Sequence, residues 1–200
     1  LSYKLEKWSD AFGGYSSLFE HAKVENNRYL ALVGKMRSAF RGHDWDHAVK
    51  EASKVAADSR TDTAMKEEAD YISAKSYLAS SRRNEAFVIL ERLSANVSGQ
   101  YGAEAAYLLI QDCYDRGDFE NVENKVYAFA DAASQQTYWL AKSFIVLGDS
   151  FVERGEVEQA IATFESVRDG YDASANGDDV MDQVEMRLKK LKDMSASAQN

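Results

Sequence analysis

The sequence contains no proline and only 11 glycines among its 200 residues. Turn-rich β proteins and flexible linkers use both residues, whereas proline interrupts helices, so this scarcity favours an all-α fold. No uninterrupted apolar run approaches the roughly 18 to 20 residues that a membrane-spanning helix needs. We therefore expect no direct insertion into a membrane, and the hydrophobic content of 45% suits a buried core instead.

Cys113 is the single cysteine, which excludes an internal disulfide. One thiol does not indicate in which cellular compartment the protein resides. Lys and Arg total 24 against 33 Asp and Glu, a formal net charge of −9. The cations are scattered among these carboxylates rather than clustered, so we expect no nucleic acid partner. The chain starts at Leu1 and shows no leader segment. We expect it to belong to a longer protein, with any targeting signal upstream.

A pattern recurs along the chain at intervals of 36 to 38 residues. Aligning ERGEVEQAIATF, which contains Gly155, with DRGDFENVENKVYAF, which contains Gly117, pairs Leu147 with Leu109. The stretches SSRRNEAFVILERL and RGHDWDHAVKEASKV extend the alignment to four copies. One position, which holds alanine in three copies and valine in the other, then recurs at Ala48, Ala86, Val122 and Ala160. Internal periodicity of this length is typical of helical repeat proteins.

Each copy reads as two helices joined by a short polar turn. In the last copy, apolar or small residues at i, i+3, i+4 and i+7 start at Phe144, and a second such series starts at Val157. Gly155 stands between them, where a left-handed residue would end the first helix. One such pair cannot bury its own apolar face, so we expect the pairs to stack.

We expect a single solenoid domain over 1–200. The predicted repeats cover 30–58, 67–96, 103–132 and 141–170. A partial helical segment over 1–29, with a break near Gly13–Gly14, precedes them, and a capping helix over 178–193 follows them.

The pattern resembles the signature of the tetratricopeptide repeat (TPR) family. The residues that carry the resemblance are Leu147, Gly148, Phe151, Gly155, Ala160 and Phe164. The chain departs from the family in lacking the proline that closes each repeat and in exceeding the usual period of ~34 residues. The first copy fits only with a shift of one residue.

The resemblance implies an antiparallel helix-pair solenoid, wound as a right-handed superhelix, that acts as a non-enzymatic scaffold and binds a protein or peptide partner. The chain is similar to the C-terminal part of long bacterial TPR proteins. That similarity implies a periplasmic or outer-membrane-associated location rather than a cytoplasmic one.

In the family, the first helix of each repeat lines the concave groove. Carrying these positions over gives nine candidate partner-binding residues: Arg37, Arg41, Tyr71, Lys75, Tyr107, Gln111, Tyr114, Lys142 and Asp149. Aromatic and arginine side chains often anchor protein interfaces. The alternative interpretation is that the tyrosines only pack against the next repeat. The set of residues with which the family clamps C-terminal carboxylates is absent, so we do not expect a chaperone-tail ligand.

The stretch HDWDH at 43–47 is the best candidate for chemistry, because His43 and His47 could share a metal ion if they lay on one helix. A structural interpretation places Asp44 as an N-cap and Trp45 as the first apolar residue of a helix. No third ligand stands at a helpful spacing. We expect no metal site, cofactor or catalytic residue, and two alternatives stay open: a metal-binding protein or metal-dependent enzyme at these histidines, or a passive solenoid spacer.

Two further candidates have structural explanations. Cys113 aligns with Phe151, where a free cysteine behaves as a small hydrophobic residue. The pair Asp178–Asp179 could bind a divalent cation, but a helix start explains it as well. The sequence leaves the oligomeric state open.

Overall fold

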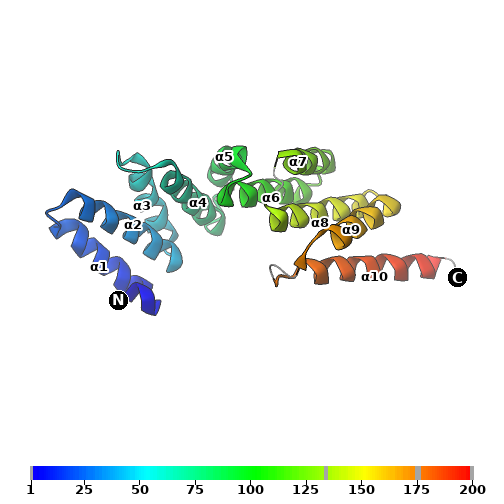
Figure 1. The fold of residues 1–200 in the computed structure, drawn as a ribbon, viewed down its shortest axis with the longest axis horizontal. Helices are drawn as coiled ribbons and strands as arrows, with labels where there is room; N and C mark the ends of the chain where they lie inside the picture. Colours follow the sequence, from blue (N-terminus) through cyan, green and yellow to red (C-terminus); the bar gives the residue numbers. More distant parts are fainter. Residues whose placement is uncertain (1, 133–134, 174–176, 199–200) are drawn as a thin grey trace. The chain divides into compact units, whose positions relative to one another are not determined.

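The computed structural model describes residues 2–132, 135–173 and 177–198, with side chains described as far as Met194. These residues form helices joined by short turns and contain no strand (Figure 1). The all-α prediction is therefore confirmed. Contacts divide the chain into unit 1, residues 1–93, and unit 2, residues 94–200. We describe each unit by itself, and one continuous solenoid over the whole chain stays a prediction.

Unit 1 is a succession of antiparallel helices in which each α-helix packs against the next. Its elements are η1 (Ser2–Leu5), α1 (Trp8–His21), α2 (Glu25–Arg41), α3 (Trp45–Ala57), α4 (Thr63–Ala79) and α5 (Arg83–Leu93). Its core is built from aliphatic side chains of α2, α3 and α4, among them Met36, Ala48 and Val55. Phe12 and Phe19 of α1 pack against this core from outside.

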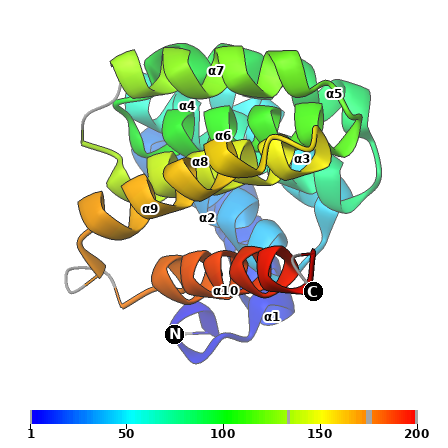
Figure 2. The ribbon, with the colours of Figure 1, turned by 90° about the vertical axis from the view of Figure 1, so that its right-hand side faces the viewer.

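Unit 2 begins with η2 (Ser94–Asn96) and continues with α6 (Gln100–Asp115), α7 (Phe119–Ala132), α8 (Thr137–Glu153), α9 (Val157–Gly170) and α10 (Val180–Ala198). Helix α8 packs against α6, α7 and α9, and α10 lies along α9 and α8 (Figure 2). The apolar stripe of α10 is buried as expected, from Val180 and Val184 to Leu188 and Leu191. Among the described residues, no helix is both long and apolar enough to cross a bilayer.

Four turns between paired helices share one backbone geometry. At the last, Gly155 has a φ of +77° and donates its N–H to the Val152 carbonyl at 3.0 Å, while Glu156 donates to the Phe151 carbonyl at 2.8 Å. These two bonds define a Schellman motif. The other three turns repeat both bonds, with the left-handed residue at His43, Ser81 and Gly117. These residues are separated by 38, 36 and 38 positions, so the helix pairs repeat in structure as well as in sequence.

The recurring small-residue position is buried in every pair. Ala48, Ala86, Val122 and Ala160 are all fully buried. In the last pair, the ring of Phe164 on α9 covers Gly148 on α8. A Cβ at position 148 would lie 2.4 Å from this ring. Gly148 is therefore required for the close approach of α8 and α9.

Two predictions about unit 1 are wrong. No break occurs at Gly13–Gly14, because α1 runs through both residues, which face solvent and keep their helical hydrogen bonds at a cost in propensity of only ~1 kcal/mol each. The first repeat also needs no shift. Its turn residue lies 38 positions before Ser81, so Ala39 rather than Phe40 stands at the position of Phe151.

Candidate interaction surface

The nine candidate groove residues all lie on the first helices of the four pairs. Arg37 and Arg41 are on α2, and Tyr71 and Lys75 are on α4, in unit 1. The other five are Tyr107, Gln111 and Tyr114 on α6 and Lys142 and Asp149 on α8, in unit 2. Because units 1 and 2 are each described by themselves, the candidates of each unit are taken in turn.

In unit 1 the candidates take part in contacts within the fold. Arg37 donates from Nε and Nη2 to the two carboxylate oxygens of Glu68, each at 2.6 Å, and this bidentate pair joins α2 to α4. The ammonium group of Lys75 lies 5.8 Å from the centroid of the Tyr71 ring on the same helix. Arg41 is exposed at the end of α2. Of these contacts, the Arg37–Glu68 pair joins two neighbouring helices, whereas the Lys75–Tyr71 contact lies within α4.

In unit 2 the tyrosines pack on the core and are only partly buried. The rings of Tyr107 and Trp139 have centroids 5.3 Å apart, and those of Tyr138 and Trp139 are 4.8 Å apart. Tyr114 packs against Phe119 at 5.9 Å. Tyr107 therefore packs against the next helix pair, as the packing interpretation predicts, whereas Tyr114 packs against α7 of its own pair.

Burial and neighbouring charges shift the pKa values of these tyrosine hydroxyls. Burial raises the pKa of Tyr107, Tyr114 and Tyr138, and nearby negative charges raise these pKa values further. For Tyr114 these charges belong to Asp149, Glu153 and Asp115. The Arg187 guanidinium acts in the opposite direction and lowers the pKa of Tyr114.

We call Tyr114, Asp115, Asp149 and Glu153 the acidic face. Asp115 accepts a hydrogen bond of 2.9 Å from the Gln111 amide, and Glu153 forms no ion pair with any described residue. Both side chains are exposed at the carboxyl ends of their helices. They occupy equivalent places, two residues before the left-handed glycine of each turn.

Sequence reasoning did not single out Arg187 of α10 as a contact residue. It donates from Nε and Nη2 to the two oxygens of Asp149, each at 2.7 Å, and both side chains are about three-quarters buried. It also lowers the pKa of Tyr107 and Tyr114, against the net upward shift. Spacing could have revealed this residue, since it lies 38 positions after Asp149, one repeat period.

Lys142 faces α10 as well. Its ammonium group lies 3.9 Å from a carboxylate oxygen of Asp179, just before the start of the helix. The contact is longer than the Arg187 pair and exposed on the aspartate side, so it is the weaker of the two.

The two histidines at 43–47 do not share a helical face. His43 lies in the turn before α3, with φ +59°, and its ring stacks on Trp45 at 4.9 Å. His47 is in the first turn of α3, where its Nδ1 lies 2.8 Å from Asp44 and its ring packs against Phe12. Asp44 accepts from the His47 N–H, as expected for an N-cap. In the part of the chain that the structure describes, no three His, Cys, Asp or Glu side chains gather as metal ligands.

The remaining candidates have structural roles. Cys113 is buried in the core of unit 2, as its alignment with Phe151 predicted. Asp178 accepts a hydrogen bond of 3.0 Å from the Val180 N–H at the start of α10. Asp179 accepts one of 2.6 Å from the Gln183 amide.

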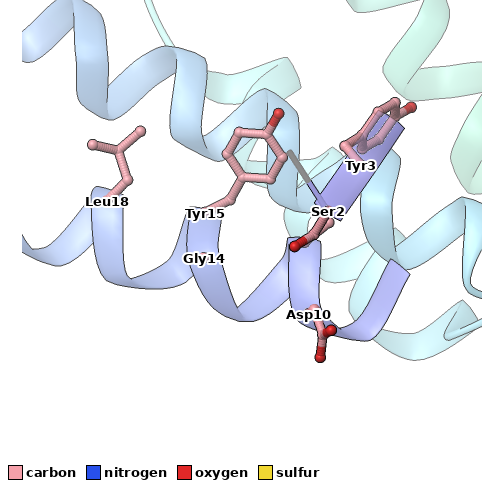
Figure 3. A pocket seen from close by; sticks show the side chains of 7 residues that line it. Ser2, Tyr3, Asp10, Gly14, Tyr15 and Leu18 are labelled. Atoms are coloured by element: carbon pink, nitrogen blue, oxygen red, sulfur yellow. The ribbon is translucent and has the colours of Figure 1, made fainter. Parts of the chain in front are cut away.

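A surface pocket of about 220 Å³ lies beside α1 in unit 1 (Figure 3). It is bounded by Tyr3, Gly14, Tyr15 and Leu18, and the carboxylate of Asp10 points away from the two rings. Asp10 is the only carboxylate among the lining residues, and neither a histidine nor a thiol accompanies it. This arrangement offers no acid–base pair or metal-ligand set.

Comparison with known proteins identifies no relative: no family model, curated protein or solved structure matches the chain.

Proposed function

We propose that this chain is a TPR-type helical-repeat scaffold that binds a protein partner and carries out no catalysis. In this proposal the four helix pairs belong to one antiparallel solenoid, and α10 caps its last pair. The observation that carries the proposal is the fourfold Schellman turn with left-handed residues at His43, Ser81, Gly117 and Gly155. Stacked repeats of one supersecondary unit characteristically present an extended surface for partners.

The residue types among the candidates favour binding of a partner over catalysis. The candidate residues on α6 and α8 include two partly buried tyrosines, Tyr107 and Tyr114, and tyrosine is one of the residue types that anchor protein interfaces. The metal alternative at His43 and His47 loses its main support, because only His47 lies on a helix and its Nδ1 contacts Asp44. The proposal therefore includes no metal and no cofactor.

Affinity capture from extracts of the source organism tests the proposal. The baits are the wild-type chain, a face variant Asp115→Lys/Glu153→Lys, and a control variant Glu120→Lys/Glu158→Lys. The control carboxylates are exposed, 38 positions apart like the first pair, and lie in the first turns of α7 and α9. Circular dichroism first establishes that all three baits have the same helix content.

We expect a partner that the wild type and the control capture and the face variant does not. Capture of the same partner by all three baits would place binding elsewhere. Absence of any partner would favour the spacer, and a turnover activity that His47→Ala abolishes would favour the metal enzyme.

A further inference from the structure

The turn at Glu6 repeats the geometry of the four turns between paired helices. Glu6 has a φ of +56° and donates its N–H to the Tyr3 carbonyl at 3.2 Å. Lys7 donates its N–H to the Ser2 carbonyl at 3.1 Å. These are the two bonds of the Schellman motif, and Glu6 lies 37 positions before His43, one repeat period. Helix α1 therefore corresponds to the second helix of a pair, and η1 corresponds to the last turn of its first helix.

In the four complete pairs, three positions of the second helix are always buried. They lie five, nine and twelve residues after the left-handed residue, all are apolar, and none is more than 6% exposed. They are Ala48, Ala52 and Val55 in α3; Ala86, Leu90 and Leu93 in α5; Val122, Val126 and Phe129 in α7; and Ala160, Phe164 and Val167 in α9. Each of these helices packs against the first helix of its own pair, and in the last pair the Phe164 ring lies on Gly148 of α8. The three positions therefore mark the face that a first helix covers.

Helix α1 has apolar residues at the same three positions, but this face is open. The residues are Ala11, Tyr15 and Leu18, which we call the open stripe, and Leu18 is 42% exposed. With Tyr3 of η1 they line the surface pocket of about 220 Å³ (Figure 3). A separate row of α1, with two phenylalanines, packs against the core of unit 1. Among the described residues, only η1 stands where the first helix of this pair would lie.

Side-chain size indicates which helix fits the open stripe. In the complete pairs, the middle buried position of the second helix can be compared with the residue seven positions before the turn on the first helix. The combinations are Ala52 with Met36, Val126 with Ile110, Leu90 with Ala74, and Phe164 with Gly148. The residue on the first helix thus becomes smaller as the one on the second helix becomes larger, which close packing of the interior requires. Tyr15 is aromatic like Phe164, so a helix that covers it needs a glycine or alanine there.

We propose that the open stripe of α1 is a docking surface for an amphipathic α-helix of a protein partner, with a glycine or alanine opposite Tyr15. This helix runs antiparallel to α1 and its carboxyl end meets η1, so it continues the interface that joins the two helices of each complete pair. Recognition of this kind takes its affinity from a few apolar anchors at helical spacing. The inference rests on the proposed scaffold function and adds a second surface to the candidate residues on the first helices.

Fluorescence anisotropy with labelled peptides tests the inference on the full chain. The probe has the sequence of α8, TYWLAKSFIVLGDSFVE, because its glycine faces an aromatic ring in the last pair. The control peptide carries Gly148→Leu. The protein variants are Leu18→Lys and the matched control Leu30→Lys. Both leucines are exposed, 42% and 55%, and Leu30 lies on α2 outside the pocket, so both substitutions leave the core intact.

We expect saturable binding of the probe to the wild type and to Leu30→Lys, because both keep the open stripe. Leu18→Lys should weaken this binding about 10-fold or more, since it removes an apolar anchor and places an ammonium group in the contact. The control peptide should also bind the wild type about 10-fold more weakly, because its leucine meets the Tyr15 ring. Hydrogen exchange should show that the bound probe protects amides of α1.

Three results of this experiment would overturn the inference: no saturable binding of the probe to the wild type; equal affinity of the two protein variants, which places the probe elsewhere; or equal affinity of the two peptides. Sedimentation of the unlabelled chain tests a second copy as the occupant. A dimer that Leu18→Lys dissociates and Leu30→Lys keeps would assign the open stripe to that copy and also overturn the inference. None of these outcomes contradicts the scaffold function, which the capture experiment tests independently.

Discussion

Gly148 shows how one side chain, or its absence, sets the distance between two helices. The Phe164 ring occupies the space that a Cβ at position 148 would need, and Phe164 is fully buried. The sequence indicates such a close approach, because Gly148 and Ala160 both fall on the apolar stripes of the two paired helices. It did not predict which ring fills the space, since that depends on the rotamer of Phe164 within the packed core.

We predict that Gly148→Ala destabilises the chain by about 1 to 3 kcal/mol, because overpacking against the buried ring exceeds the gain in helix propensity. Urea denaturation measures the change. The matched control is Gly13→Ala, also inside a helix, where no atom lies within 4 Å of the new Cβ. This control should stabilise the chain by about 0.5 to 1 kcal/mol. Stabilisation by both substitutions would show that the ring moves aside freely.

Glu51 is the buried charge of unit 1, with a side chain only 2% exposed. It pairs with Lys35 of α2 at 3.4 Å and with Lys54 of its own helix at 2.9 Å. Lys35 also lies over the rings of Phe12 and Phe19 of α1. The carboxylate therefore neutralises a cation that three helices enclose.

We predict that Glu51→Ala destabilises the chain by about 3 to 5 kcal/mol, because it leaves the Lys35 ammonium buried and unpaired. Lys54→Ala should cost less than about 1 kcal/mol, since that lysine is half-exposed. Thermal denaturation measures both. The double variant Lys35→Met/Glu51→Met should recover most of the loss, and a double variant as unstable as Glu51→Ala would contradict this explanation.

At the scale of elements, the C-terminal helix α10 packs against α8 and α9. Its apolar stripe was predictable, because valine and leucine recur at helical spacing from Val180 to Leu191. Its polar contact left only one signal in the sequence, the separation of 38 positions between Asp149 and Arg187, because helical spacing within α10 also allows Arg187 to face water. The bidentate pair with Asp149 decides the orientation of this side chain.

We predict that Arg187→Met loosens α10 by about 1 to 2 kcal/mol, because it removes two charged hydrogen bonds from a partly buried position. Hydrogen exchange should show lower protection of amides in α10, with little change in α7. Lys189→Met, at an exposed position on the same helix, serves as the control. Equal loss of protection in both variants would contradict a specific role of the ion pair.

The tyrosines of α6 and α8 make unit 2 sensitive to alkaline pH. The pKa values of Tyr107, Tyr114 and Tyr138 are raised in the folded state, so the folded chain holds protons that the unfolded chain loses near pH ~10. Their contribution to stability is therefore complete below that pH and is lost as the pH rises above it.

We predict that the free energy of unfolding falls between about pH 9 and about pH 11, and falls less in a variant with phenylalanine at all three positions. Urea denaturation across this range measures both proteins. An identical decrease in the variant would assign the effect to lysines or to other tyrosines.

At the scale of the whole molecule, the fold class was more predictable than the surface. The absence of proline and the recurrence of Ala48, Ala86, Val122 and Ala160 predicted helices and their pairing, because burial imposes this pattern on the sequence. Surface contacts such as the Arg187 pair depend on side-chain direction, which periodicity leaves open. Residues that serve only a partner leave no such pattern in a single sequence.

The left-handed residues at the two turns of unit 1 also escaped prediction. Gly117 and Gly155 favour that conformation, but His43 and Ser81 do not, and only the shared spacing links them. A non-glycine residue there is strained by roughly 1 to 2 kcal/mol, which the two Schellman hydrogen bonds and the packing of the helix pair offset.

The most direct test of the fourfold repeat is therefore urea denaturation of four single variants at these turns. We predict that His43→Gly and Ser81→Gly stabilise the chain by about 0.5 to 1 kcal/mol, because glycine relieves the strain. Gly117→Ala and Gly155→Ala should each destabilise it by about 1 kcal/mol, because alanine introduces the same strain. Destabilisation by both glycine substitutions would contradict the equivalence of the four helix pairs, and with it the repeat scaffold on which the proposed function rests.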